Sequence, residues 1–110
     1  MLFVWEGDGY MKYKVMEIIE VDREGNSKEK ESVFNTYNQT VYFIKCRMRE
    51  VIMKDTLKFF RYNKIKITTE KLKKHCEDDF KFWLEEADKD QFCYVASYLG
   101  WSCFWIIEEV

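Results

Sequence analysis

The spacing of apolar residues changes from a period of two to a helical period at about residue 40, and this change constrains the fold more than any other feature. Before that point apolar and charged residues alternate, and the apolar set is Met11, Tyr13, Val15, Ile19 and Val21. A period of two is typical of a half-buried β-strand. Glu17 interrupts the apolar side, and Met16 and Ile18 interrupt the polar side, so we expect a β-bulge or twist near Glu17.

Turn signals divide the rest of the N-terminal third. Residues 6–9 read Glu-Gly-Asp-Gly and predict a tight turn between residues 2–5 and this strand, because glycine supplies the positive φ of such turns. Residues 22–32 are charged and contain Gly25-Asn26, which predicts a solvated loop before a short strand over residues 33–37. The sequence therefore predicts an antiparallel β meander.

A long helix is predicted over residues 40–62 because its apolar residues recur at helical spacing on two faces. One face comprises Val41, Ile44, Met48, Ile52 and Phe59, and the other comprises Tyr42, Cys46, Met53, Leu57 and Phe60. A helix with two apolar faces needs cover on both sides. We expect a sheet on one side and either a second helix or a partner on the other.

The C-terminal half predicts a further helix and a buried strand. Residues 65–68 favour a short strand, and Thr69 then caps a helix over residues 70–87. The core stripe of this helix is Leu72, Cys76, Phe80, Trp83 and Ala87. Residues 91–99 fit either a helix ended by Gly100 or one strand of a hairpin, and we favour the helix. Residues 101–107 are almost all apolar and predict a strand in the middle of a sheet.

These elements predict an α+β fold made of an N-terminal antiparallel β meander, a long helix, a second amphipathic helix and a C-terminal buried strand. No linker, repeat or low-complexity tract divides the chain, so we expect one domain over residues 1–110.

The cysteines predict free thiols in the cytoplasm. Cys46, Cys76, Cys93 and Cys103 are not preceded by a signal peptide, because Glu6 and Asp8 interrupt the N-terminal residues. The longest uncharged run is residues 91–107, which at 17 residues is shorter than the roughly 20 needed to span a bilayer. We therefore expect no membrane segment.

Signals of catalysis and of metal binding are weak. The cysteines and His75 form neither Cys-x-x-Cys nor His-x-x-x-His, and the glycines form no phosphate-binding loop. Adjacent carboxylates such as Asp78 and Asp79 point apart on a helix, whereas acid–base catalysis needs them to converge. We expect no catalytic residue, no metal and no cofactor.

Charge is strongly polarised along the chain, with net charges of −3 over residues 1–44, +8 over residues 45–74 and −7 over residues 75–110. On the predicted long helix, a narrow basic stripe comprises Arg47, Lys54, Lys58 and Arg61. This stripe could bind an acidic protein surface or a ribonucleoprotein, or contact nucleic acid. Alternatively, the acidic C-terminal third packs on it within the chain.

Three aromatic residues without a predicted core position, namely Phe82, Tyr94 and Tyr98, complete the expected partner-binding set, because aromatic side chains beside charge are typical of binding hot spots. The leading hypothesis is a small non-catalytic protein-binding module, and the alternative is a nucleic-acid-binding module that uses residues 45–74. Residues typical of AT-rich genomes dominate the composition, which suggests a phage- or plasmid-encoded inhibitor of a host factor such as a defence nuclease, with anti-defence activity. The composition is also compatible with a homo-oligomer.

Overall fold

The structure is a computed structural model that describes residues 12–22 and 24–110. Along this part of the chain the elements are β1 (Tyr13–Val21), β2 (Lys28–Phe34), α2 (Tyr37–Tyr62), α3 (Thr69–Glu85), β3 (Gln91–Ala96) and β4 (Trp101–Glu109). An antiparallel sheet with two helices in this order confirms the predicted α+β class. The turn predicted at residues 6–9, together with residues 2–5 that it links to β1, lies outside the described residues.

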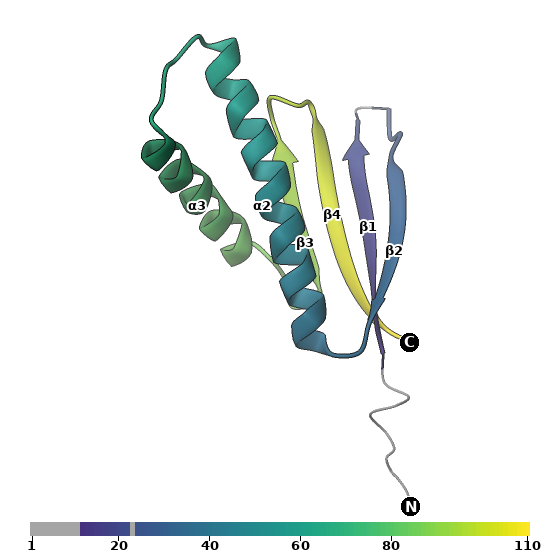
Figure 1. Cartoon of the computed structure of the whole chain (residues 1–110). Coiled ribbons are helices and arrows are strands. Elements are labelled where there is room, and N and C mark those ends of the chain that lie inside the picture. Colours follow the sequence, from purple (N-terminus) through teal and green to yellow (C-terminus); the bar gives the residue numbers. More distant parts are fainter. Residues whose placement is uncertain (1–11, 23) are drawn as a thin grey trace, which may run out of the picture.

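The four strands form one antiparallel sheet in the order β2-β1-β4-β3 (Figure 1). β1 is paired on both sides, with β2 from Tyr13↔Phe34 to Ile19↔Lys28 and with β4 from Tyr13 to Val21. The register against β4 shifts between Ile18 and Val21, and Glu20 has a φ of 58° there. The expected bulge therefore lies just beyond Glu17.

Both helices begin at a threonine cap. The side chain of Thr36 accepts a hydrogen bond from the backbone N–H of Gln39 (3.1 Å), so α2 begins three residues earlier than predicted. Thr68 does the same for Lys71 (3.2 Å), so α3 begins at Thr69 instead of being capped by it. Residues 65–68, predicted as a strand, form a connection between the helices.

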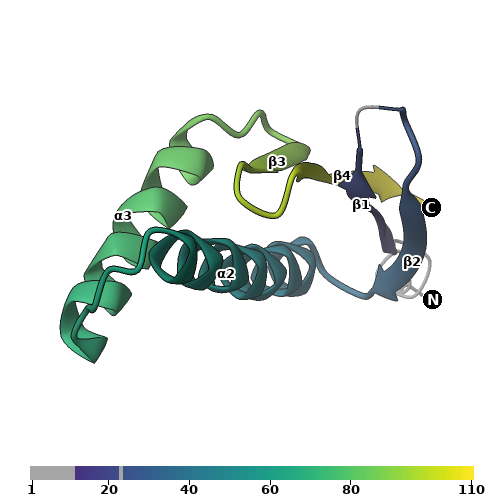
Figure 2. The same ribbon diagram turned by 90° about the horizontal axis from the view of Figure 1, so that it is seen from above.

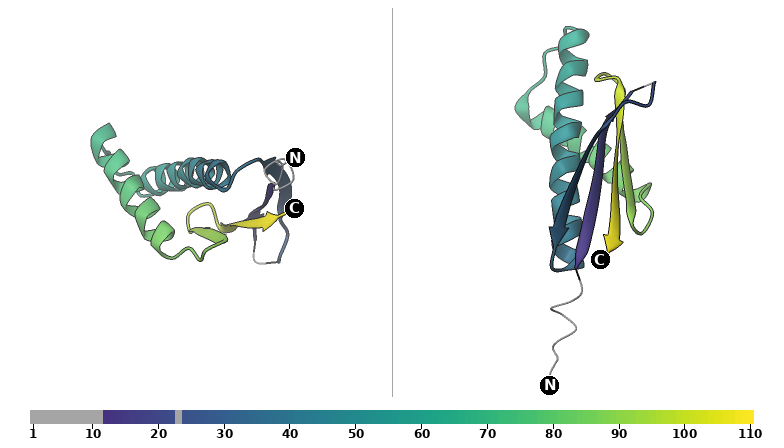
Figure 3. Two further views of the ribbon diagram at one scale, coloured as in Figure 1. Left: turned by 90° about the horizontal axis from the view of Figure 1, so that it is seen from below. Right: turned by 90° about the vertical axis from the view of Figure 1, so that its right-hand side faces the viewer.

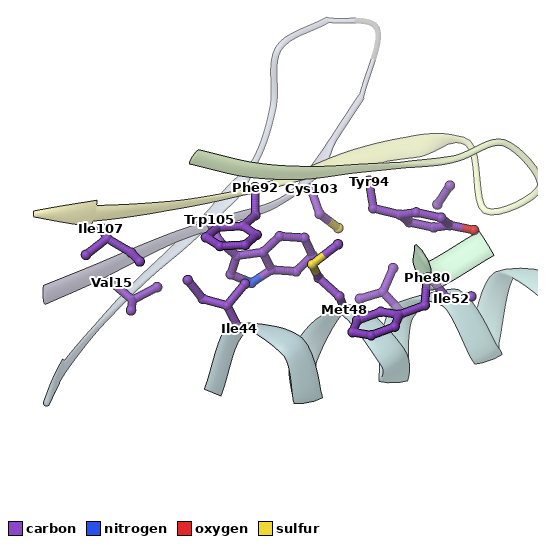
Figure 4. Packing of buried hydrophobic residues seen from close by; sticks show 12 residues of the cluster. Val15, Ile44, Met48, Ile52, Phe80, Phe92, Tyr94, Cys103, Trp105 and Ile107 are labelled. Atoms are coloured by element: carbon purple, nitrogen blue, oxygen red, sulfur yellow. The ribbon is translucent and has the colours of Figure 1, made fainter. Parts of the chain in front are cut away.

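α2 lies across one face of the sheet, here called the inner face, and α3 packs against α2 and β3 (Figure 2). The core between α2 and the sheet contains Trp105, which is fully buried against Ile44 and Met48 of the helix (Figure 4). Phe80 of α3 is 4% exposed and closes the core near Tyr94. The first apolar face predicted for the long helix thus supplies core residues, namely Ile44, Met48 and Ile52. The main contribution of α3 to this core is Phe80.

Residues 91–99 form β3 and the turn after it, so the preferred helix at this position is wrong. Phe92, Tyr94 and Ala96 alternate inward and are buried, while Val95 between them is 48% exposed. Pairing with β4 over the whole length of β3, from Gln91↔Ile106 to Ala96↔Trp101, outweighs the helical spacing. Nonlocal pairing of this kind overrides local propensity.

The strand predicted at residues 33–37 is also misplaced. β2 covers Lys28–Phe34, and Tyr37 already belongs to α2. The predicted loop at residues 22–32 is correspondingly shorter. The charges that suggested a loop lie on an edge strand, where side chains on both faces reach solvent.

Candidate functional site

Arg47, the first residue of the predicted basic stripe, is bound to a buried carboxylate. Its Nε and Nη2 donate to the two carboxylate oxygens of Glu17 at 2.7 and 3.2 Å, and its Nη1 donates to Glu50 at 2.9 Å. Glu17 is 3% exposed and also accepts from the indole Nε1 of Trp105 at 2.8 Å. Arg47 therefore neutralises a charge inside the fold and does not belong to a free surface stripe.

Burial alone would raise the pKa of Glu17. The hydrogen bonds from Arg47 and Trp105, together with the charge of Arg47, outweigh burial and hold the pKa of this carboxyl below its usual value. The same carboxylate raises the pKa of Arg47. Glu17 is thus an ionised group that joins β1, β4 and α2.

Tyr94, predicted as a surface aromatic, lies in the core at 3% exposure. Its hydroxyl donates to Asp55 Oδ2 at 3.0 Å, while Asp55 Oδ1 accepts from the backbone N–H groups of Tyr98 (2.9 Å) and Leu99 (2.8 Å). Burial and the charge of Asp55 raise the pKa of Tyr94. Asp55 therefore connects α2 to β3 and to the turn between β3 and β4. Asp55 and Tyr94 both have a structural role.

The other three residues of the predicted stripe are exposed and belong to a larger group where α2 ends and α3 begins. We call this group the basic end. Its members are Lys54, Lys58, Arg61, Lys64, Lys66, Lys71, Lys73 and Lys74. Within residues 54–74 the acidic residues are the buried Asp55 and the exposed Glu70, so the segment has a net charge of +6. Figure 1 shows the connection between the helices at the top of the molecule.

The acidic C-terminal third does not neutralise the basic end in the part of the chain that the structure describes. One ion pair involves a member of the end, between Lys74 and Asp78 of the same helix at 3.1 Å. Arg49 of α2 and Glu77 of α3 also form an ion pair, at 3.3 Å, but Arg49 is not a member of the basic end. The cations of the basic end other than Lys74 thus face solvent without an acidic partner among the described residues.

Exposed apolar side chains accompany these charges. Tyr62 is 77% exposed and Ile65 is 47% exposed, and both lie within the basic end. Tyr98 is half-exposed and contacts the ring of Phe59 with centroids 4.7 Å apart, close to the end of α2. Phe82 is exposed on the C-terminal half of α3, beside Trp83. Tyr98 therefore contacts the end of α2 that carries the basic end, whereas the aromatic neighbour of Phe82 is on the C-terminal half of α3.

A second surface was missed by the sequence prediction. The sheet face opposite α2, here called the outer face, is not covered by either helix (Figure 3). The pairs Met16↔Ile106, Ile18↔Phe104 and Phe104↔Cys93 place a row of apolar side chains on it. An uncovered face is usually polar. Met16 and Ile18, which interrupt the polar side of the β1 pattern, are the signal that could have identified this face.

Three of the four cysteine thiols lie where burial disfavours their reactive form. Burial raises the pKa of Cys103 to about 12 and also raises the pKa of Cys76 and Cys93, which disfavours the nucleophilic thiolate. The Nε2 atom of His75 lies 3.6 Å from Oδ2 of Asp79, one turn further along α3. Residues 12–22 and 24–110 contain no cluster of three or more histidine, cysteine or acidic side chains that could hold a metal ion.

The described helices include none that is both long enough and apolar enough to cross a membrane. Two surfaces stand out among the described residues: a cationic helical end with exposed apolar residues, and an apolar sheet face that neither described helix covers. Comparison with protein-family models, with curated proteins and with solved structures found no match to this chain.

Proposed function

We propose that this protein is a non-catalytic binding module that attaches to an acidic surface of another protein through its basic end. The observation that carries the proposal is the set of exposed cations on residues 54–74, of which Lys74 alone has an ion pair in the described part of the chain. Cations that do not stabilise the fold remain available to a ligand. Such a charge also accelerates encounter with an oppositely charged partner.

A protein partner is favoured over nucleic acid by the distribution of charge and apolar surface. The chain has a net charge of −2, so the residues outside the segment 54–74 carry −8 against +6 within it. A long phosphate backbone would meet this acidic remainder, whereas a discrete acidic patch need contact the basic end alone. Tyr62 and Ile65 supply the apolar anchors that protein interfaces use.

A module of this kind acts stoichiometrically, by occupying the surface of its partner. Residues typical of AT-rich genomes dominate the sequence, which favours a bacterial host factor as the partner and inhibition of that factor as the result of binding. Arg47 and Tyr94 take no part in the proposed contact, because one neutralises Glu17 and the other is buried.

Charge reversal at the basic end, with a control of equal charge, tests the proposal. The test variant carries Lys54→Glu, Lys58→Glu and Arg61→Glu. The control carries Lys12→Glu, Lys81→Glu and Lys89→Glu, which are also exposed and change the net charge equally. All three proteins are immobilised and incubated with bacterial lysate, both before and after nuclease treatment.

We expect a protein that the wild type and the control retain and the test variant loses by at least tenfold. Equal retention by the test variant would contradict the proposal. A parallel titration with a 20-base-pair duplex at increasing salt examines the alternative. A partner that disappears after nuclease treatment, with duplex affinity falling steeply with salt, would favour the nucleic-acid-binding module.

A further inference from the structure

β2 is an edge strand that borders an open hollow. Among the described strands, β2 pairs only with β1, so the backbone groups along its other edge have no strand partner there. A hollow of about 640 Å³ lies between β2 and the first half of α2. It is lined by Val33, Phe34, Asn35, Asn38, Gln39, Tyr42, Phe43 and Cys46. We call this feature the β2 groove.

The β2 groove exists because α3 covers only part of the second apolar stripe of α2. In the C-terminal half, Cys76 Sγ of α3 lies 3.9 Å from Met53 Sδ, and His75 packs edge-on against Phe60 with centroids 5.6 Å apart. In the N-terminal half, Tyr42 is 70% exposed. Phe34 and Phe43, whose centroids are 5.0 Å apart, join β2 to the helix and line the groove.

The charges of β2 disfavour a second copy of this chain as the occupant. Lys28 and Lys30 pair with Ile19 and Glu17, so they project to the inner face, whereas Glu29 and Glu31 project to the outer face. Antiparallel pairing of two copies about a two-fold axis brings together residues of the same face. No register of that pairing places a lysine opposite a glutamate, so the dimer gains no attractive cross-strand charge pair.

We propose that the free edge of β2 and the β2 groove bind an extended segment of another protein by strand addition. Backbone hydrogen bonds to a sheet edge provide affinity, and pockets for alternate side chains provide selectivity. Lys28 and Glu31 already pair with Glu20 and Lys14 of β1. The segment therefore carries an acidic side chain opposite Lys30, a basic side chain opposite Glu29, and a large apolar side chain that fills the groove beside Tyr42. This surface is separate from the basic end, so the inference goes beyond the proposed function.

The probe is a phage-displayed library of random 12-residue peptides, selected on the wild-type chain and then synthesised with a fluorescent label. The test variant is Val33→Lys with Tyr42→Ser, and the control is Val95→Lys with Phe82→Ser, at two positions outside both the β2 groove and the basic end. All four positions are exposed and each variant replaces the same kinds of residue, so both variants should fold. We expect at least a tenfold loss of affinity for the test variant and less than a twofold change for the control.

Hydrogen exchange locates the bound peptide. We expect slower exchange of amides in Lys28–Phe34 on binding, with exchange in Gln91–Ala96 unchanged. Recovery of no peptide, equal affinity for the test variant, or protection confined to other strands would overturn the proposal. A variant with residues 2–5 changed to serine tests the chain's own first residues. Tenfold tighter peptide binding to that variant would mean that residues 2–5 of this chain occupy the β2 groove. It would overturn the proposal that the groove binds another protein.

Discussion

A single buried carboxylate illustrates how much of this fold depends on individual residues. Glu17 interrupts an apolar stripe, and the sequence explains it as the site of a bulge. In the structure Glu17 is buried on the inner face, where Arg47 and Trp105 donate hydrogen bonds to its carboxylate. A buried charge is tolerated only when it is paired and hydrogen-bonded. Its two partners come from distant segments, so the sequence pattern could not reveal them.

The ionisation of Glu17 predicts a specific acid sensitivity. Because the pKa of Glu17 is lower in the folded chain than its ordinary 4.5, its contribution to stability is complete above that pH and is lost as the pH falls through the folded pKa. We expect Glu17→Gln to be less stable than wild type at pH 7, and the difference to shrink below about pH 4.5. Urea unfolding at pH 7 and pH 3 measures this. Equal acid destabilisation of the two proteins would show that Glu17 is not the group responsible.

Arg47 provides the matched control for this site. Arg47→Met leaves Glu17 buried without its main cation, and loss of one partner of a buried pair costs about 3 to 5 kcal/mol. We therefore expect Arg47→Met to be less stable than Glu17→Gln at pH 7. The reverse order would mean that the pair is not the main source of stabilisation.

At the scale of elements, the sequence predicted the helices better than the strands. Apolar spacing located both helices to within three residues at their first turns because it reflects burial within one continuous segment. β2 and β3 are edge strands, and their assignment depends on partners far along the chain. Asp55 adds a further distant contact, because it accepts hydrogen bonds from the turn after β3. Local periodicity contains none of this information.

The sequence also predicted only those parts of the candidate site that depend on local spacing. Exposed cations at helical spacing gave Lys54, Lys58 and Arg61, whereas Arg47 looked equivalent until the position of Glu17 was known. Tyr94 could not be assigned to the core while residues 91–99 were expected to be helical. The apolar outer face had one signal in the sequence, Met16 and Ile18 on the polar side of the β1 pattern, but this signal does not state on which side of the sheet the helices pack.

The core face of α3 yields a prediction that separates its two aromatic residues. Phe80 is 4% exposed in the core, whereas Trp83 is half-buried and contacts Tyr94 edge-on at 5.5 Å between centroids. Phe80→Ala should therefore cost about 3 to 5 kcal/mol. Trp83→Ala should cost less, because part of its surface is already in water. Denaturant unfolding of both variants compares them, and a larger loss for Trp83→Ala would mean that α3 is rotated about its axis.

At the scale of the whole molecule, charge is separated between the basic end and the acidic remainder. The segment 54–74, which contains the basic end, has a net charge of +6, and one member of the basic end, Lys74, has an ion pair among the described residues. Like charges gathered at one end repel each other, and this repulsion is screened by salt. We therefore expect these residues to add little to the stability of the fold, in contrast to Arg47 with its ion pair to the buried Glu17.

This separation predicts how stability responds to salt. Raising sodium chloride from 0.05 M to 0.5 M should stabilise the wild type by about 1 kcal/mol, or roughly 4 °C in melting temperature, because repulsion within the basic end is screened. The variant with Lys54→Glu, Lys58→Glu and Arg61→Glu should melt no lower than the wild type at low salt and should respond less to salt. The control with Lys12→Glu, Lys81→Glu and Lys89→Glu adds negative charge to an acidic surface, so its response should be larger. Circular dichroism melting of the three proteins at both salt concentrations measures these responses. A wild type that is destabilised by salt, or a basic-end variant that melts several degrees lower, would instead mean that the acidic C-terminal third holds these cations within the fold.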